Sequence, residues 1–182
     1  MKRIYVLFLL AVALYGSAQQ TTFRIQYNFS QFDFPTAMLN APGPNYVFSS
    51  QVISGFSLPI GARGGLTEVD QYGTHVRSTL YNNGGFTTSV DFADVKPISA
   101  GRYVVTGDAN SQCLVAKIPA AFGTPTWQYR YVPVSGASAY GNRIIQASDG
   151  GFVIAGTAVR CQTKAHAILI DSNFHFQTNN FS

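Results

Sequence analysis

Charged residues are scarce in this 182-residue chain, at 11% of the total, and Glu68 is the single glutamate. Long helix-forming side chains are few, whereas the chain holds 17 glycines and 14% aromatic residues. A helical fold depends on residues that this sequence lacks, and a disordered chain would be more polar than one with 46% hydrophobic residues. The composition is typical of a turn-rich β protein, and the length suffices for one domain with a hydrophobic core.

Clusters of lysine and arginine are lacking as well. The formal net charge is +4 for the whole chain, and it falls to +2 without Lys2 and Arg3, which leaves 10 basic and 8 acidic residues. Proteins that follow the phosphate backbone of a nucleic acid need grouped positive charges. Nucleic acid is therefore not expected as a partner.

No apolar run reaches the roughly 20 residues that a bilayer-spanning helix needs. The longest, at 4–15, follows two basic residues and is followed by Gly-Ser-Ala at 16–18. A short apolar run between a basic start and small residues is the three-part pattern of a secretory signal peptide. We expect residues 1–18 to be removed, and residues 19–182 to be secreted or held at the cell surface after passing the periplasm, without a membrane span.

Three similar segments recur along the chain. Each starts with an aromatic residue and continues as a mostly apolar strand, at residues 46–50, 103–107 and 152–156. In each unit a shorter apolar segment and a small-residue turn come before, and two more strands come after. The third strands are predicted to end at Val69, Ile118 and Ile170. The spacing of about 50 residues is that of a kelch-sized unit, and four short strands match a β-propeller blade.

We therefore predict an all-β fold of tandem four-stranded antiparallel blades, a partial β-propeller of about three blades plus one leading strand at 22–30. The predicted units are residues 37–81, 94–132 and 143–181, within one repeat domain at 19–182. Propellers typically have four to eight blades, so the alternatives are an incomplete propeller and an open array of three sheets. The rival fold is a two-sheet sandwich.

The third unit carries a resemblance to a known group of proteins. Its residues 149–157, DGGFVIAGT, with AILIDSN at 167–173, resemble the propeller-like repeats of secreted Bacteroidetes proteins that often carry a type IX secretion sorting domain. The first unit departs from this pattern at Pro42, Pro44 and Ser50, and the second has Pro-Ala-Ala in place of the Asp-Ser-Asn turn. The resemblance implies an architecture and export, not an activity.

No motif predicts catalysis, a cofactor or a metal. The chain has no Gly-x-Ser-x-Gly elbow, phosphate-binding loop or dinucleotide fingerprint. Glu68 and Asp70 lie on the same side of one strand, too near in sequence to flank a sugar substrate. Oxygen donors alternate at 108–112, but a calcium loop needs a glycine and a distal glutamate, so we expect a polar turn. No histidine has metal-ligand spacing, and all three are expected at the surface or at strand edges: His75, His166 and His175.

The two cysteines, Cys113 and Cys161, occupy corresponding places between the second and third strands of neighbouring units. Loops at these places emerge on one face, and export would permit a disulfide, which needs Cα atoms within about 7 Å. The alternatives are a Cys113–Cys161 bridge and two partly buried free thiols. Because no cysteine precedes Cys113, a lipid anchor at the cleavage site is not expected.

The longest connection, residues 51–65 of the first unit, is the predicted binding loop. Phe56, Leu58 and Ile60 alternate in it with smaller residues, and Arg63 is its only charge. Long connections are often functional, but this one has two alternatives, an insertion that covers a blade edge and an extra strand. If the loop binds a ligand, it should share a face with the two cysteine loops.

The expected function is that of an exported, non-catalytic binding or scaffold module for an unknown protein or glycan ligand. The alternative is a part of an exported carbohydrate-active enzyme whose catalytic residues lie outside this chain. Trp127, Tyr129 and Tyr131 alternate along one strand. That pattern predicts packing between blades, with a sugar-stacking platform as the alternative.

Overall fold

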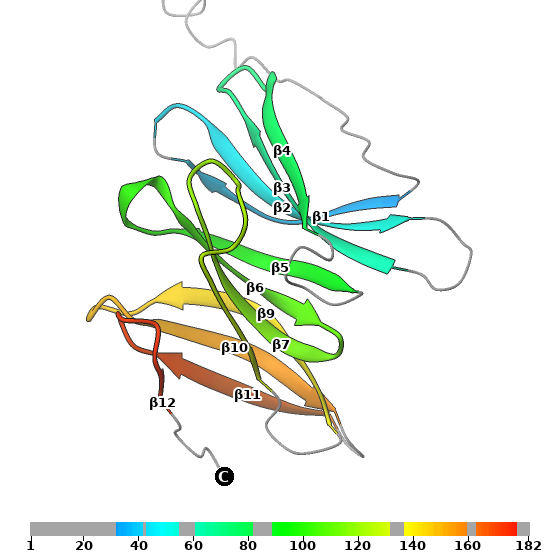
Figure 1. Cartoon of the computed structure of the whole chain (residues 1–182), viewed down its shortest axis with the longest axis vertical. Helices are drawn as coiled ribbons and strands as arrows, with labels where there is room; N and C mark the ends of the chain where they lie inside the picture. The colour runs from blue at the N-terminus through cyan, green and yellow to red at the C-terminus, as the bar shows by residue number, and fades with distance from the viewer. Residues whose placement is uncertain are drawn as a thin grey trace, which may run out of the picture.

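The computed structural model describes residues 32–41, 43–54, 61–81, 89–131, 137–159 and 163–177. These residues form three antiparallel sheets of four strands, and the strands of every sheet lie side by side in chain order (Figure 1). Sheet 1 contains β1 (Phe32–Asn40), β2 (Tyr46–Ser54), β3 (Gly61–Val69) and β4 (His75–Tyr81). Sheet 2 contains β5 (Val90–Pro97), β6 (Tyr103–Ala109), β7 (Gln112–Ile118) and β8 (Trp127–Tyr131), with the 3-10 turn η1 (Ser99–Gly101) between β5 and β6. Sheet 3 contains β9 (Ser138–Gln146), β10 (Phe152–Val159), β11 (Thr163–Ile170) and β12 (Phe176–Gln177).

The predicted all-β class and the repeated strand order are confirmed. The third strands β3, β7 and β11 end at Val69, Ile118 and Ile170, as predicted. Three sheets in series replace the two sheets of the alternative sandwich. The predicted leading strand at 22–30 lies outside the described residues.

Each first strand contains a one-residue bulge at the same place. The extra residues are Thr36 in β1, Ala93 in β5 and Asn142 in β9. The bulges face equivalent pairs on the second strands: Ser49-Ser50, Thr106-Gly107 and Ala155-Gly156. A bulge bends its strand and increases the local twist. Because the bulge is shared, each residue of one sheet has an equivalent residue in the other two.

In sheets 2 and 3 a glycine faces the bulge, because there the bulged strand comes close to its neighbour. A Cβ atom at Gly107 or Gly156 would collide with a backbone carbonyl oxygen of the first strand. Ser50 holds the same place in sheet 1, and the residue paired with it across the sheet is Gly65. A Cβ atom at Gly65 would collide with the Ser50 hydroxyl. Each sheet thus keeps one residue of this cross-strand pair without a side chain.

Two hydrophobic cores join the three sheets. The first lies between sheets 1 and 2 and includes Val47, Leu66, Phe92, Val95, Tyr103 and Leu114. The second lies between sheets 2 and 3 and includes Val104, Val115, Ile144, Phe152, Ile154 and Ile168. Neighbouring residues such as Tyr103 and Val104 serve different cores, because successive side chains of a strand point to opposite faces. Sheet 2 is therefore buried on both of its faces.

The turns after the third strands attach each sheet to the one before it. Phe122 and Phe174 adopt left-handed backbone conformations in these turns, with φ angles of 57° and 67°. The Arg77 guanidinium of sheet 1 lies 4.4 Å from the centre of the Phe122 ring, and the Lys117 ammonium of sheet 2 lies 4.6 Å from the centre of the Phe174 ring. Both junctions thus place a cation of one sheet over an aromatic ring of the next.

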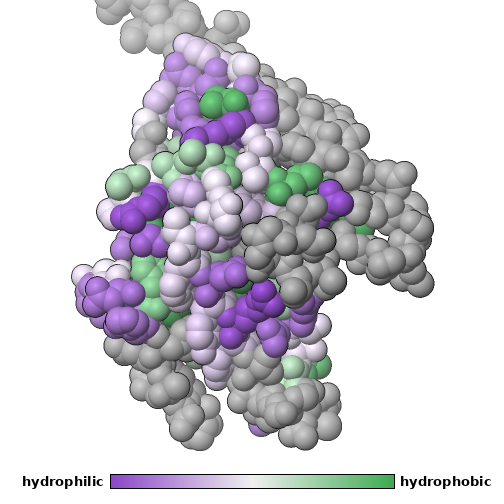
Figure 2. All heavy atoms as spheres, in the orientation of Figure 1, coloured by the Kyte–Doolittle hydropathy of each residue, from purple (hydrophilic) through white to green (hydrophobic). Residues whose placement is uncertain are grey.

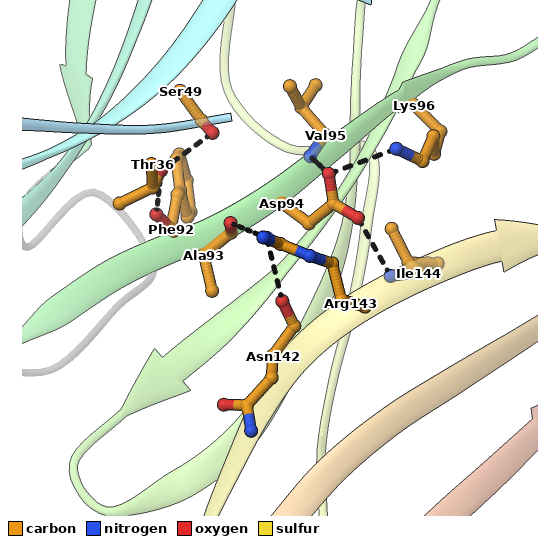
Figure 3. Close-up of polar contacts among 10 residues, drawn as sticks. All are labelled: Thr36, Ser49, Phe92, Ala93, Asp94, Val95, Lys96, Asn142, Arg143 and Ile144. Carbon is orange, nitrogen blue, oxygen red and sulfur yellow. Dashed lines mark hydrogen bonds and ion pairs between the residues drawn. The ribbon is translucent and has the colours of Figure 1, made fainter. Parts of the chain in front are cut away.

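Polar contacts at the bulges also cross from sheet to sheet (Figure 3). Between sheets 1 and 2, the Thr36 hydroxyl donates to the carbonyl oxygen of Phe92 at 2.6 Å. Between sheets 2 and 3, the backbone N–H of Ile144 donates to Asp94 Oδ2 at 3.0 Å, and Arg143 Nη1 donates to the carbonyl oxygen of Ala93 at 3.3 Å. The bulge of sheet 2 therefore takes part in both junctions.

Asp94 is a buried acidic residue at these contacts. Its side chain is 2% exposed, and Oδ1 accepts hydrogen bonds from the Val95 N–H at 2.9 Å and from Lys96 Nζ at 3.1 Å. A carboxylate can be buried at modest cost only when its oxygens are hydrogen-bonded and its charge is paired. Both oxygens of Asp94 accept hydrogen bonds, and Lys96 pairs with its charge. Oδ2 joins sheet 2 to sheet 3 through the Ile144 N–H.

Replacing Gly107 with alanine should lower the free energy of unfolding by about 2–3 kcal/mol, because the new methyl group overlaps the Asp91 carbonyl oxygen. Gly123→Ala is the matched control, since the nearest atom to its Cβ would be Pro119 Cγ at 3.4 Å. Urea denaturation of both variants measures the difference. Equal stability of the two variants would show that the bulge tolerates a side chain.

Replacing Asp94 with asparagine should lower the free energy of unfolding by about 2–3 kcal/mol, because it removes a charged acceptor and places an amide N–H₂ against other donors. Asp149→Asn is the control. Asp149 is exposed and accepts one hydrogen bond, from the Gly151 N–H at 2.9 Å, which asparagine preserves in such turns. The idea fails if thermal melts show the same loss for both variants.

Candidate functional site

The second strands β2, β6 and β10 all point to the same side of the molecule, on the right in Figure 1. The β6–β7 turn lies at this end, between the starts of β5 and β9. The Asn110 N–H donates to the Ser89 carbonyl oxygen at 3.3 Å, and the Ala139 N–H donates to the Ser111 carbonyl oxygen at 2.8 Å. The ends of the second strands, the β6–β7 turn and the starts of β5 and β9 therefore lie at one end of the molecule, which we call the connection end.

A pair of carboxyl groups, Asp91 and Asp108, lies at the connection end of sheet 2. Strand register places Asp91 opposite Asp108, Asp108 opposite Cys113, and Cys113 opposite Tyr131. Side chains directly opposite one another in an antiparallel pair are close neighbours. The four residues thus form one row across the sheet.

The two carboxyl groups perturb each other. Burial, reinforced by the negative charge of Asp108, raises the pKa of Asp91 to about 6. Burial also raises the pKa of Asp108, although the Ser111 backbone N–H that donates to both of its oxygens works in the opposite direction. Asp91 Oδ1 is buried without a hydrogen-bond partner. The pair can therefore hold a proton in mildly acidic solution.

Cys113 does not lie in a loop as predicted. It lies inside β7, because the β6–β7 turn at Asn110 and Ser111 is tight, and its side chain is fully buried in the second core. Burial raises the pKa of its thiol to about 12, so the thiol stays protonated and is a poor nucleophile. Cys113 is a free thiol. Its predicted partner Cys161 lies outside the described residues, so the predicted bridge stays a prediction.

The predicted binding loop is shorter than its sequence suggested. Residues on both sides of it, from Gln51 to Ser54 and from Gly61 to Gly65, pair as the ends of β2 and β3. Arg63 therefore lies in β3, opposite Val52. The other residues of the predicted site lie outside the described residues: Phe56, Leu58 and Ile60.

Trp127 and Tyr131 of β8 pack between sheets, as expected, whereas Tyr129 is 39% exposed. The Trp127 ring lies 5.0 Å from the Phe174 ring and 6.5 Å from the Tyr129 ring, and Trp127 and Tyr131 contact the second core. The Tyr131 ring lies 6.1 Å from the ring of His166. Burial lowers the pKa of His166, and both of its ring nitrogens are buried without a hydrogen-bond partner.

The remaining acidic and histidine candidates have local partners. Glu68 is buried, pairs with Arg77, and accepts a hydrogen bond from Asn45 Nδ2 at 2.6 Å. Asp70 accepts hydrogen bonds from two backbone N–H groups of the β3–β4 turn. Asp171 does the same in the β11–β12 turn, where His175 Nδ1 lies 3.3 Å from it. His75 contacts the Ser78 hydroxyl.

Sequence reasoning missed the Asp91–Asp108 pair. Asp108 was noticed only as part of a polar turn, and Asp91 lies 17 positions earlier in the chain. The strand register that joins them depends on the bulge at Ala93, which moves the pairing by one residue. Asp91 itself gives no signal in the sequence, because it occupies the polar position of the alternation Val90-Asp91-Phe92.

The face drawn in Figure 2 shows small hydrophobic areas scattered among neutral and hydrophilic ones. In the part of the chain that the structure describes, no three His, Cys, Asp or Glu side chains are grouped as a metal site. Over the same residues, no helix has the length and apolarity needed to cross a membrane.

Comparisons with known proteins found a similar solved structure, described below, and no matching family. No protein family matches the chain, and no curated protein matches it. A solved structure of a protein of unknown function from Bacteroides caccae is similar, with 10% identity, a TM-score of 0.27 and coverage of 81% of each chain. A similarity of this strength supports no inference about function.

Replacing Asp91 with asparagine should make the chain more stable above pH 7, by about 1–2 kcal/mol, because a partly buried charge is removed. The folded pKa of Asp91 is about 6 against 3.8 for the unfolded group, so its contribution to stability is present below pH 4 and is lost as pH rises through 6. The variant should lack this loss. Urea denaturation between pH 4 and pH 8 measures both effects.

Asp171→Asn is the control for the pH series. The backbone N–H groups of His175 and Asn173 lower the pKa of Asp171, so this carboxyl group titrates below pH 4. Its replacement should leave the stability change between pH 4 and pH 8 as it is in the wild type. If the free energy of unfolding of the Asp91 variant still falls between pH 4 and pH 8 as in the wild type, another group causes that fall.

Proposed function

We propose that this chain is an exported, non-catalytic binding module whose three sheets are blades of a propeller-like repeat. Residues 1–18 direct export, and the module acts at the cell surface or outside the cell. The ligand contacts the connection end. Binding follows from several short connections that act together rather than from one deep pocket.

The observation that carries this proposal is the common direction of the three sheets. Equivalent bulges lie beside one another at both junctions, through the Thr36–Phe92 and Asp94–Ile144 contacts. Strands at the same place in each sheet therefore run the same way, and their connections emerge together. Loops held on a rigid scaffold are the usual place for binding residues.

An extracellular glycan is the ligand class that we propose to test first. Aromatic and small polar side chains are abundant in this chain and charges are few, which suits ligands that offer hydroxyl groups and apolar sugar faces. Neutral oligosaccharides need no strong electrostatic field for binding.

Replacing Phe56, Leu58 and Ile60 with serine should abolish binding to the oligosaccharides that the wild-type chain retains on a glycan array. The reason is that these residues stand between β2 and β3 in the sequence, and β2 ends at the proposed binding end. The matched control replaces Ala120 and Ala121 with serine in the β7–β8 turn, at the opposite end of sheet 2.

Circular dichroism should show the same β spectrum for both variants. Binding that survives the triple substitution, or that is lost equally in the control, would place the ligand elsewhere. A wild-type chain that retains no oligosaccharide would overturn the glycan proposal. Hydrolysis of a retained oligosaccharide would favour an enzyme over a binding module.

A further inference from the structure

The β6–β7 turn has a backbone conformation that its second residue disfavours. Asn110 and Ser111, the two central residues, have left-handed φ angles of 54° and 61°. A two-residue hairpin turn requires these angles, and glycine is the usual residue at the second position. Serine carries a Cβ atom that crowds the backbone in this conformation. The turn therefore needs contacts that hold Ser111 in place.

Hydrogen bonds from three strands hold the turn. Both oxygens of the Asp108 carboxyl group on β6 accept from the Ser111 N–H, at 3.1 and 3.0 Å. The Asn110 N–H donates to the Ser89 carbonyl oxygen just before β5, and the Ser111 carbonyl oxygen accepts from the Ala139 N–H of β9. The turn thus joins the starts of β5 and β9, and its conformation depends on Asp108.

Asp91 lies where its charge disturbs Asp108. Strand register places Asp91 opposite Asp108, and Asp108 opposite Cys113, which packs in the second core. The two carboxyl groups therefore share the face of sheet 2 that is turned toward sheet 3. Asp91 Oδ1 is buried without a hydrogen-bond partner. The neutral acid is the form of Asp91 that suits this place.

Cations do not offset the negative charge of the pair. Among the described residues, no Lys, Arg or His forms an ion pair with either carboxyl group. The sequences that lead into β5 and β9, residues 82–88 and 132–136, contain no charged residue. The titratable and charged side chains that surround the pair are Cys113 and Tyr131 in the same row, the Asp94–Lys96 ion pair beyond the bulge, and Arg143, Lys164 and His166 on sheet 3.

We propose that the Asp91–Asp108 pair is a pH switch that closes and opens the β6–β7 turn. While Asp91 holds its proton, Asp108 alone carries a negative charge and keeps Ser111 in place. When Asp91 releases the proton to solvent, two facing carboxylates repel each other. Water solvates both of them once the turn leaves the starts of β5 and β9. The turn is closed in mildly acidic solution, and the open fraction grows as the pH rises.

The direction of the switch depends on the pKa of Asp91, which burial and the charge of Asp108 raise from 3.8 to about 6. The resulting stabilisation of the closed turn is fully present below pH 4 and is lost as the pH rises through 6. From pH 5 to pH 8 the equilibrium should shift roughly tenfold toward the open turn. His166 acts in the opposite direction, because burial lowers its pKa and its contribution is lost as the pH falls.

Amide hydrogen exchange of the purified chain, measured by NMR and corrected for intrinsic rates, tests the switch. The Ser111 and Ala139 N–H groups should exchange faster than the N–H of Val105, which lies in β6 between two paired strands. Their protection factors should fall roughly tenfold from pH 5 to pH 8. Low concentrations of urea should leave their exchange unchanged, because a local opening exposes little surface.

Two variants and an internal control assign the effect to the pair. Asp91→Asn should remove the fall in protection, because the amide resembles the neutral acid and does not ionise. Asp108→Asn should reduce the fall, because burial still disfavours the Asp91 charge. The control is the Asn173 N–H, which donates to Asp171 Oδ1 at 2.9 Å. Since the pKa of Asp171 is lowered by backbone N–H groups, this protection should stay constant from pH 5 to pH 8.

Three results would overturn the proposal. They are protection factors of Ser111 and Ala139 that do not fall with pH, a fall that persists in Asp91→Asn, and exchange that matches Val105 in rate and in urea dependence. The last result would mean that the turn opens only when the whole chain unfolds. The switch does not depend on the proposed ligand. A turn that stays closed in a chain that binds oligosaccharides would leave the proposed function intact.

Discussion

The close approach of the bulged first strand to the second strand is the constraint on which the rest of the structure depends. In sheets 2 and 3 it requires a missing side chain on the second strand, at Gly107 and at Gly156. The bend also turns the backbone groups of the bulge outward, where Phe92, Ala93 and Ile144 make contacts between sheets. Local steric crowding and long-range assembly thus have one origin.

The serial arrangement gives the three sheets unequal roles. Sheet 2 contributes to both cores and holds the buried carboxylate of Asp94, whereas sheets 1 and 3 contribute one core face each. Stability in such an array is close to a sum of nearest-neighbour junctions. Sheet 2 stabilises both of its neighbours, and its own strands are shielded from water on both faces.

The sequence predicted the fold class and the repeat because the signals are local. Aromatic starts, alternating apolar residues and Gly or Pro turns locate strands, and the ends at Val69, Ile118 and Ile170 were correct. The placement of Cys113 was wrong because a two-residue turn at Asn110 and Ser111 left no room for a loop. The Asp91–Asp108 pair was missed because its register depends on a bulge, and a bulge leaves no periodic mark in a sequence.

In sheet 1 the glycine of this cross-strand pair lies on the third strand, as Gly65 opposite Ser50, whereas in sheet 2 it lies on the second strand, as Gly107 opposite Leu114. This difference affects how repeats of this kind are detected. What each unit preserves is a glycine at one of two paired positions on adjacent strands, not at a fixed one of the two. A profile that scores columns independently penalises the first unit twice, once for its serine and once for its glycine. A profile that scores the two positions jointly would treat all three units as equals.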